Sequence, residues 1–345
     1  MKPGLKPIAQ PLLVTMGDAA GIGPEIIVRA FEQGALAGCV VVGDLAVLRR
    51  AGAAMTAVLD APADGAMVPP GCLPLWVPDG LPAGLAALPQ GRIDGRNGRA
   101  AARCVEAAVR QVMAGTASGI VTAPIHKEAL AAAGVPYPGH TEMLQALATA
   151  PGAAPPPVRM MLANAELRVV LVTIHLALRR AIEALDFDAV LQTVQIAHRF
   201  AGRAGAAPPR IAVAGLNPHA GEGGLFGDEE LRFIAPAVQA ARAAGLDVQG
   251  PFAPDTVFMR ARRGEFDVVV AMVHDHGVIP VKYLGVEQGV NVTLGLPFVR
   301  TSPDHGTAFD IAGRALADPA SLIAAVQMAW QLCGAATLEP RTPPC

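Results

Sequence analysis

The sequence contains no long apolar run, few aromatic residues and no paired cysteines. Aromatic residues make up 4% of the 345 residues while 52% are hydrophobic, so the core must consist mainly of Ala, Val, Leu and Ile. The five cysteines lie far apart without a CxxC pair, which argues against a zinc knuckle or a disulfide framework and indicates a reducing cytoplasm. No stretch approaches the roughly 18 apolar residues of a membrane span, and the first residues lack a signal-peptide pattern. With a net charge of −2, the chain has no excess of basic residues for nucleic acid.

A dinucleotide-binding fingerprint is also missing. The segments Gly17-Asp-Ala-Ala-Gly-Ile-Gly23 and Gly221-Glu-Gly-Gly-Leu-Phe-Gly227 are rich in glycine, but neither has GxGxxG or GxxxxGK[ST] spacing. Each could be a structural turn or a ligand-binding loop. A nicotinamide cofactor would therefore bind in a non-Rossmann way.

Apolar runs alternate with Ala-rich helical stretches along the chain, and the length suits two α/β domains or one large one. We expect strands at 11–16, 38–43, 73–77 and 119–123, and helices at 24–31, 98–115, 141–150 and 228–244. The remainder of residues 55–95 is expected to be irregular. This alternation predicts a mainly parallel sheet with both faces covered.

Four apolar runs are followed by histidine, at His126, His175, His219 and His274. Ligands of open parallel α/β sheets bind beyond the carboxyl ends of the strands, where such side chains can converge. Three histidines with an open position are typical of a catalytic metal. His175, His219 and His274 therefore predict a metal site, although each could instead be satisfied locally.

Two aspartates accompany these histidines: Asp275 directly follows His274, and Asp255 lies between His219 and His274. They could orient the imidazole rings or complete the coordination of the metal.

Groups suited to anions occur in two other regions. His140 and Thr141 precede or begin an expected helix, whose N-terminus could hold a phosphate or carboxylate or could simply be capped. Lys282, Asn291 and Arg300 lie in the last third of the chain. Arg300 could bind an anion as a fork and Lys282 as a point charge, unless both are ordinary surface charges.

Taken together, these segments resemble the 4-hydroxythreonine-4-phosphate dehydrogenase family of vitamin B6 biosynthesis over residues 11–325. The resemblance depends on the segments Gly17–Glu25, Thr122–Lys127, Gly139–Glu142, Leu216–Gly224, Pro254–Thr256, His274–Asp275, Val290–Ser302 and Asp304–Gly306. The resemblance implies an isocitrate/isopropylmalate-dehydrogenase-like, non-Rossmann fold with two α/β/α domains. We expect residues 1–130 plus 300–345 in the first domain and 131–299 in the second. The family also implies a homodimer with its active site at the interface.

The resemblance implies a divalent metal on His175, His219 and His274, with zinc preferred over magnesium, cobalt or manganese, and NAD or NADP as cofactor. It implies substrate contacts from His140, Thr141, Lys282, Asn291 and Arg300. Asp275, Asp255 and Lys282 are the candidates for proton transfer. The expected reaction is oxidation and decarboxylation of 4-phosphooxy-L-threonine to 3-amino-2-oxopropyl phosphate.

One departure bears on the substrate. The family's main branch has Gln where this chain has His276, and the run to Pro280 and Lys282 is more similar to a paralogous branch. Members of that branch oxidise D-threonate or D-erythronate 4-phosphate, or aromatic cis-dihydrodiol carboxylates. Rivals from other classes are an acyl-phosphate transferase, which needs no metal, and a non-catalytic sugar-acid binding protein.

Overall fold

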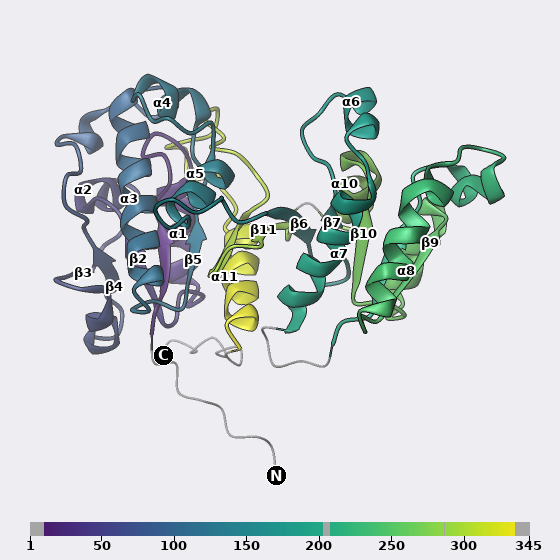
Figure 1. Cartoon of the computed structure of the whole chain (residues 1–345). Helices are drawn as coiled ribbons and strands as arrows, with labels where there is room; N and C mark the ends of the chain where they lie inside the picture. The colour runs from purple at the N-terminus through teal and green to yellow at the C-terminus, as the bar shows by residue number, and fades with distance from the viewer. Residues whose placement is uncertain (1–9, 203–207, 286, 335–345) are drawn as a thin grey trace, which may run out of the picture. The chain divides into compact units, whose positions relative to one another are not determined.

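The computed structural model describes residues 10–202, 208–285 and 287–334 of the chain (Figure 1). They form two compact units, one within Met1–Pro156 and Leu296–Cys345 and the other spanning Pro157–Gly295. The first unit is thus built from two separate segments of sequence, while the second is continuous.

The strands of the first unit pair with one another in parallel. In spatial order its strands are β3 (Thr56–Leu59), β4 (Leu73–Trp76), β2 (Cys39–Val42), β1 (Leu12–Thr15), β5 (Gly119–Thr122) and β12 (Val299–Pro303). Strands β1, β2 and β5 are buried along their whole length, which explains why they read as continuous apolar runs.

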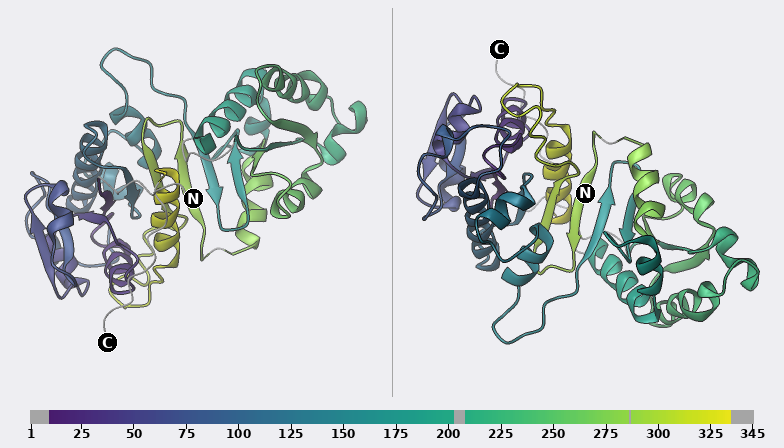
Figure 2. Two further views of the ribbon diagram at one scale, coloured as in Figure 1. Left: turned by 90° about the horizontal axis from the view of Figure 1, so that it is seen from below. Right: turned by 90° about the horizontal axis from the view of Figure 1, so that it is seen from above.

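The helices of this unit are α1 (Gly23–Glu32), α2 (Leu45–Arg50), α3 (Gly95–Met113), α4 (Lys127–Ala132), α5 (His140–Leu147) and α11 (Ala320–Leu332). Short 3₁₀ turns lie at Pro62–Met67 and Leu85–Ala87. Helix α11 runs along β12 and packs on α1, whereas α3 packs on β1, β5 and α4 (Figures 1 and 2). Helix α5, within the residues expected to form the second domain, packs against α3 of this first unit.

The second unit has a mixed sheet in the order β11 (Val290–Leu294), β6 (Arg159–Ala163), β7 (Arg168–Leu171), β10 (Val268–Ala271), β8 (Ile211–Ala214) and β9 (Val248–Phe252). Strand β6 is antiparallel to both of its neighbours, and the pairs from β7 to β9 are parallel. Its helices are α6 (Leu178–Glu183), α7 (Phe187–Gly202), α8 (Ala235–Ala243), α9 (Pro254–Arg262) and α10 (His274–Tyr283).

Helices cover both faces of the second sheet. Val269 and Ala271 of β10 belong to a core cluster with Val257 of α9 and Val281 of α10. Because successive side chains of a strand point to opposite faces, Val270 points the other way, and α7 packs there on β10 and its neighbours. The predicted fold class, two α/β units with mainly parallel sheets, is confirmed.

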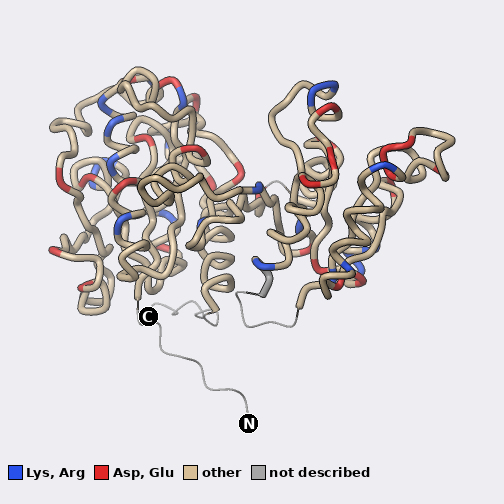
Figure 3. The backbone as a smooth tube through the Cα atoms, in the orientation of Figure 1, with Lys and Arg blue, Asp and Glu red and all other residues tan. Residues whose placement is uncertain are grey.

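Charges are mixed within each unit: Figure 3 shows basic and acidic segments interspersed along the tube. Among the residues that the structure describes, no helix is both long and apolar enough to cross a membrane.

Candidate functional site

Two of the predicted metal-binding histidines lie side by side in the second unit. Strands β7 and β10 are parallel neighbours, and their pairing continues past the strand ends, where Thr173 Oγ1 donates to the Met272 carbonyl at 2.8 Å. The chain following each strand therefore emerges at the same edge, and the ring centroids of His175 and His274 are 5.8 Å apart. His274 Nδ1 lies 2.7 Å from Oδ1 of Asp275.

This pair has the spacing of two ligands on one ion. With metal–nitrogen distances of about 2.1 Å, two imidazoles on a tetrahedral metal have ring centres roughly 5 to 6 Å apart. A carboxylate on the remote nitrogen of a ligating histidine is the common supporting contact, and Asp275 provides it. Among the described residues, however, no three His, Cys, Asp or Glu side chains lie close enough to form a complete metal site. The participation of His219 thus stays a prediction.

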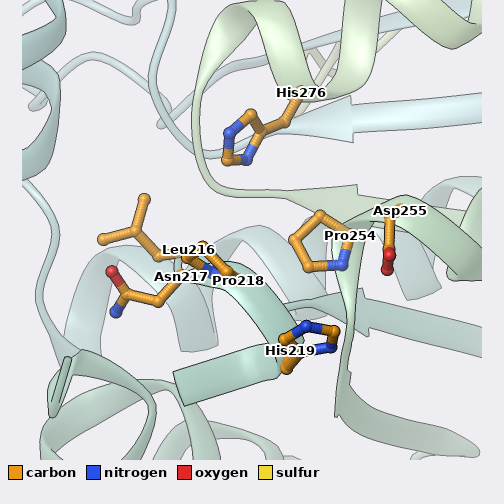
Figure 4. Close-up of a pocket in the computed structure, with 7 residues that line it drawn as sticks. All are labelled: Leu216, Asn217, Pro218, His219, Pro254, Asp255 and His276. Atoms are coloured by element: carbon orange, nitrogen blue, oxygen red, sulfur yellow. The ribbon is translucent and has the colours of Figure 1, made fainter. Parts of the chain in front are cut away.

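His219 borders a cavity of about 270 Å³ in the same unit. The cavity is lined by Leu216, Asn217, Pro218, His219, Pro254, Asp255 and His276. In Figure 4, His276 points from α10 toward this space, across from the Leu216–His219 segment. The cavity is thus lined by the predicted metal ligand His219, by Asp255 as a predicted proton acceptor, and by His276.

The backbone at His175 and His219 is in the left-handed region, with φ of 32° and 52°. A non-glycine residue there is uncommon and marks strain that the surrounding structure must hold. Two of the three predicted ligands therefore lie on constrained turns immediately after strands.

Arg300 is a buried cation in the first unit. It lies on β12 with 4% of its surface exposed, and β5 runs beside it. Its Nε and one terminal nitrogen donate to Thr122 Oγ1 at 3.2 and 2.7 Å. Burial lowers the pKa of Arg300 to about 10, so the guanidinium remains charged at pH 7. A buried guanidinium suits a phosphate or carboxylate.

His140 belongs to the same electrostatic group. Burial, and then the charge of Arg300, hold the pKa of His140 well below its usual value, so the ring is neutral. Its Nε2 is buried and has no hydrogen-bond partner among the described residues. Since a buried polar atom is normally paired, a ligand atom or water is expected there.

The remaining predicted substrate residues are spread over three elements. Thr141 is in the first turn of α5 and partly buried, Asn291 lies on β11 opposite Leu162, and Lys282 is exposed near the end of α10. The structure thus groups His140 with Arg300 in one unit, and Asp255 with His219 in the other.

A buried carboxyl group, Asp18, was not singled out from the sequence. Gly17 before it has φ of 71° and sits against Pro124, where a Cβ would lie 2.3 Å from the carbonyl oxygen. Asp18 Oδ1 accepts from the Ala20 backbone N–H at 2.8 Å, whereas Oδ2 has no partner in the described part of the chain. Burial raises the pKa of Asp18 to about 6, against the opposing effects of the Ala20 N–H and His126.

This raised pKa predicts a pH-dependent loss of stability. The folded protein holds the Asp18 proton more tightly than the unfolded chain, so the stability from this group falls as pH rises from about 4 to about 6. Asp18→Asn keeps the bond from Ala20 and cannot ionise. The free energy of unfolding of Asp18→Asn minus that of the wild type should therefore rise by up to about 3 kcal/mol between pH 4 and 7. Urea denaturation at a series of pH values measures this difference.

Asp94→Asn is the control, because hydrogen bonds from Arg96 lower the pKa of Asp94 and reverse the sign of the effect. A flat difference between Asp18→Asn and the wild type would contradict the prediction.

The chain is similar to known proteins over nearly its whole length. The chain is 53% identical to a 4-hydroxythreonine-4-phosphate dehydrogenase of Beijerinckia indica over 93% of this chain and 95% of that protein. It is 46% identical to a D-threonate 4-phosphate dehydrogenase of Pectobacterium atrosepticum, over 93% and 98% of the two chains. The crystal structure of a 4-hydroxythreonine-4-phosphate dehydrogenase from Klebsiella pneumoniae superposes with a TM-score of 0.85 at 43% identity, covering 94% of this chain and 98% of that one.

The fold and the groups at its strand ends define an α/β protein of the class whose ligands bind at the carboxyl edge of a mainly parallel sheet. The family of the pyridoxal phosphate biosynthetic protein PdxA matches residues 35–329. The chain belongs to this family, as its sequence motifs predicted.

Proposed function

We propose that this protein is an NAD(P)-dependent dehydrogenase that converts 4-phosphooxy-L-threonine to 3-amino-2-oxopropyl phosphate in pyridoxal phosphate biosynthesis. The observation that carries the proposal is the 53% identity, over nearly the whole chain, to a relative named for this activity. The adjacent His175 and His274 support it, because a hydroxyl group is activated for oxidation by a metal held in this way.

His175 and His274 would hold the metal, with His219 as the third ligand. The ion, zinc in preference to magnesium, cobalt or manganese, would act as a Lewis acid and would lower the pKa of the substrate C3 hydroxyl. Asp275 keeps its carboxylate on His274 Nδ1 and so orients that ring.

The chain's own residues then move the protons. A bound NAD(P)+ would accept the hydride from C3, and the hydroxyl proton would pass to a basic side chain of the protein. Loss of C1 as CO2 follows, and the resulting enolate takes up a proton. Asp255, which lines the cavity beside His219, and Lys282 are our candidates for these transfers, because Asp275 is engaged with His274.

Arg300 and His140 would bind an anionic end of the substrate, helped by Thr141. Arg300 brings a positive charge that is already desolvated, and neutral His140 brings a buried nitrogen without a partner in the described chain. Lys282 and Asn291 are proposed as further substrate contacts.

A second candidate is the oxidation of D-threonate 4-phosphate. Relatives with that name are 46 and 47% identical over 93 and 92% of this chain. The two substrates differ at C2, where one carries an amine and the other a hydroxyl, so the same residues could serve both.

Steady-state NADH or NADPH production by the metal-reconstituted protein separates the candidates. The substrates to compare are 4-phosphooxy-L-threonine, the 4-phosphates of D-threonate and D-erythronate, and a cis-dihydrodiol carboxylate. We expect the highest kcat/KM on 4-phosphooxy-L-threonine. A preference for a sugar-acid phosphate would make the second candidate correct, and no turnover on any substrate would reject the dehydrogenase.

We also place the protein in the cytoplasm as a homodimer whose active site lies at the interface. The cysteines that the structure describes are free thiols, as a reducing compartment favours. Helix α10, which begins at His274, exposes 62% of Ile279 and 89% of Tyr283 one turn apart, a pattern typical of a surface that a partner covers. Light scattering should give the mass of two chains, and a monomer would reject the dimer.

A further inference from the structure

The loop that carries His219 has an unusual backbone. His219, Ala220, Gly221, Glu222 and Gly223 all have positive φ, between 43° and 78°. Left-handed geometry costs a non-glycine residue about 1 to 2 kcal/mol, and three of these five residues are not glycine. Contacts from elsewhere must therefore hold the loop in place.

Glu230 makes such contacts. It lies in the π-helical turn Glu230–Ile234 and is 3% exposed. Its Oε1 accepts from the backbone N–H groups of Leu216 and Asn217 at 2.7 and 2.8 Å, and its Oε2 accepts from Asn217 Nδ2 at 2.9 Å. One buried carboxyl group thus fixes the start of the loop by three hydrogen bonds.

The same carboxyl group packs against the backbone on both sides of His219. A Cβ at Gly215 would lie 2.9 Å from Oε1, and a Cβ at Gly221 would lie 2.7 Å from Oε2. The two glycines leave room for the carboxyl group, so the loop is wrapped closely around Glu230. The ring of Phe226, 6.0 Å from that of His219, adds a contact from the far end of the loop.

Four of the seven residues that line the cavity come from this loop, whereas Glu230 does not line it. We infer that Glu230 is a positioning residue, which sets the place of His219 and of one cavity wall by holding the Leu216–Gly227 loop. The inference rests on the proposed function where zinc affinity and turnover are the readouts, whereas the exchange of the loop amides tests it directly. We infer that the position of the carboxyl oxygens, close enough to accept from the backbone N–H groups of the loop, matters more than their negative charge.

Three variants distinguish the effect of side-chain length at residue 230 from the effect of its charge. Glu230→Asp keeps the charge but withdraws the carboxyl group by one methylene, so the bonds from Leu216 and Asn217 are lost. Glu230→Gln keeps an oxygen facing both N–H groups, but it loses the charge and places an amide nitrogen opposite Asn217 Nδ2, so the third hydrogen bond is lost as well. Glu229→Gln is the matched control, because the neighbouring Glu229 accepts only from Asn217 Nδ2, at 2.7 Å, and is less buried.

Hydrogen exchange followed by mass spectrometry tests the loop directly. In Glu230→Asp, amides of residues 216–227 should exchange at least about tenfold faster than in the wild type, with peptides from β7 and α7 unchanged. In the same variant the zinc dissociation constant should rise by about 10 to 100-fold, and kcat/KM should fall by about the same factor. Effects of this size are typical of groups that orient metal ligands. Glu229→Gln should stay within about threefold of the wild type in all three measurements. Glu230→Gln keeps the two bonds from backbone N–H groups and loses the one from Asn217 Nδ2, so its effects should lie between those of Glu229→Gln and Glu230→Asp.

Unchanged exchange and zinc affinity in Glu230→Asp would overturn the inference, as would a Glu230→Gln variant that loosens the loop as much. If Glu230→Asp fails to fold, faster loop exchange in Glu230→Ser supports the inference and unchanged exchange refutes it. Because hydrogen exchange needs neither metal nor substrate, a wild-type protein without turnover would reject the proposed function and leave the exchange test intact.

Discussion

Arg300→Met should lower kcat/KM on a phosphorylated substrate by roughly 10² to 10³-fold and leave the fold intact. Losing one partner of a buried, hydrogen-bonded charge pair costs about 2 to 5 kcal/mol, and each 1.4 kcal/mol is a factor of ten. Arg300 is 4% exposed and its guanidinium is held by Thr122, so it requires little reorganisation to receive an anion. Methionine has a similar length without the charge, so it refills most of the space of the arginine side chain.

Two companion variants show which property of Arg300 matters. Arg300→Lys keeps the positive charge without the planar fork and should lose less activity than Arg300→Met. Thr122→Val keeps the charge and removes the hydroxyl that orients it, so its effect should be smaller still. Wild-type kcat/KM in Arg300→Met, with an unchanged melting temperature, would remove Arg300 from the substrate site.

His219→Asn is expected to reduce kcat on the order of 10³-fold and to weaken zinc binding. Lewis-acid stabilisation by a bound metal is worth several kcal/mol, which corresponds to this factor. Asparagine is the appropriate replacement because it tolerates the left-handed backbone at this position better than most residues. A fall in activity should therefore report the lost imidazole and not a rearranged loop.

Zinc content by atomic emission and steady-state kinetics measure the two effects. His198→Asn, at a partly exposed histidine of α7 away from the cavity residues, serves as the control and should behave like the wild type. If His219→Asn retained full activity and full zinc content, the metal would depend on His175 and His274 without this third histidine.

Much of the fold could be predicted because its strands are buried on both faces. Apolar runs such as those of β1 and β5 stand out without any partner sequence. Strand β3 was missed within the region expected to be irregular. It is half-exposed at the edge of its sheet, so the hydrophobic pattern is weak at Thr56–Leu59.

The site was predicted less completely, since spacing along the chain carries no distance in space. Strand-end position allowed His175 and His274 to meet, and the structure brings their rings to 5.8 Å because β7 and β10 are neighbours. Glu230 could not be found in this way, because the run Asp228-Glu-Glu230 has the pattern of a solvated helix start. Its burial depends on glycines at two earlier positions that wrap around the carboxyl group.

The discontinuous first unit has a consequence for synthesis on the ribosome. All strands of Pro157–Gly295 are available once Gly295 has left the exit tunnel, so the second unit can complete its sheet while the chain is still growing. The first unit, although translated earlier, lacks β12 and α11 until the final segment emerges. Until then the β5 edge of its sheet stays open, and an open edge invites pairing with other nascent chains. The unit that is translated second can therefore complete its sheet first, while the N-terminal part of the chain waits for its last strand with an exposed edge.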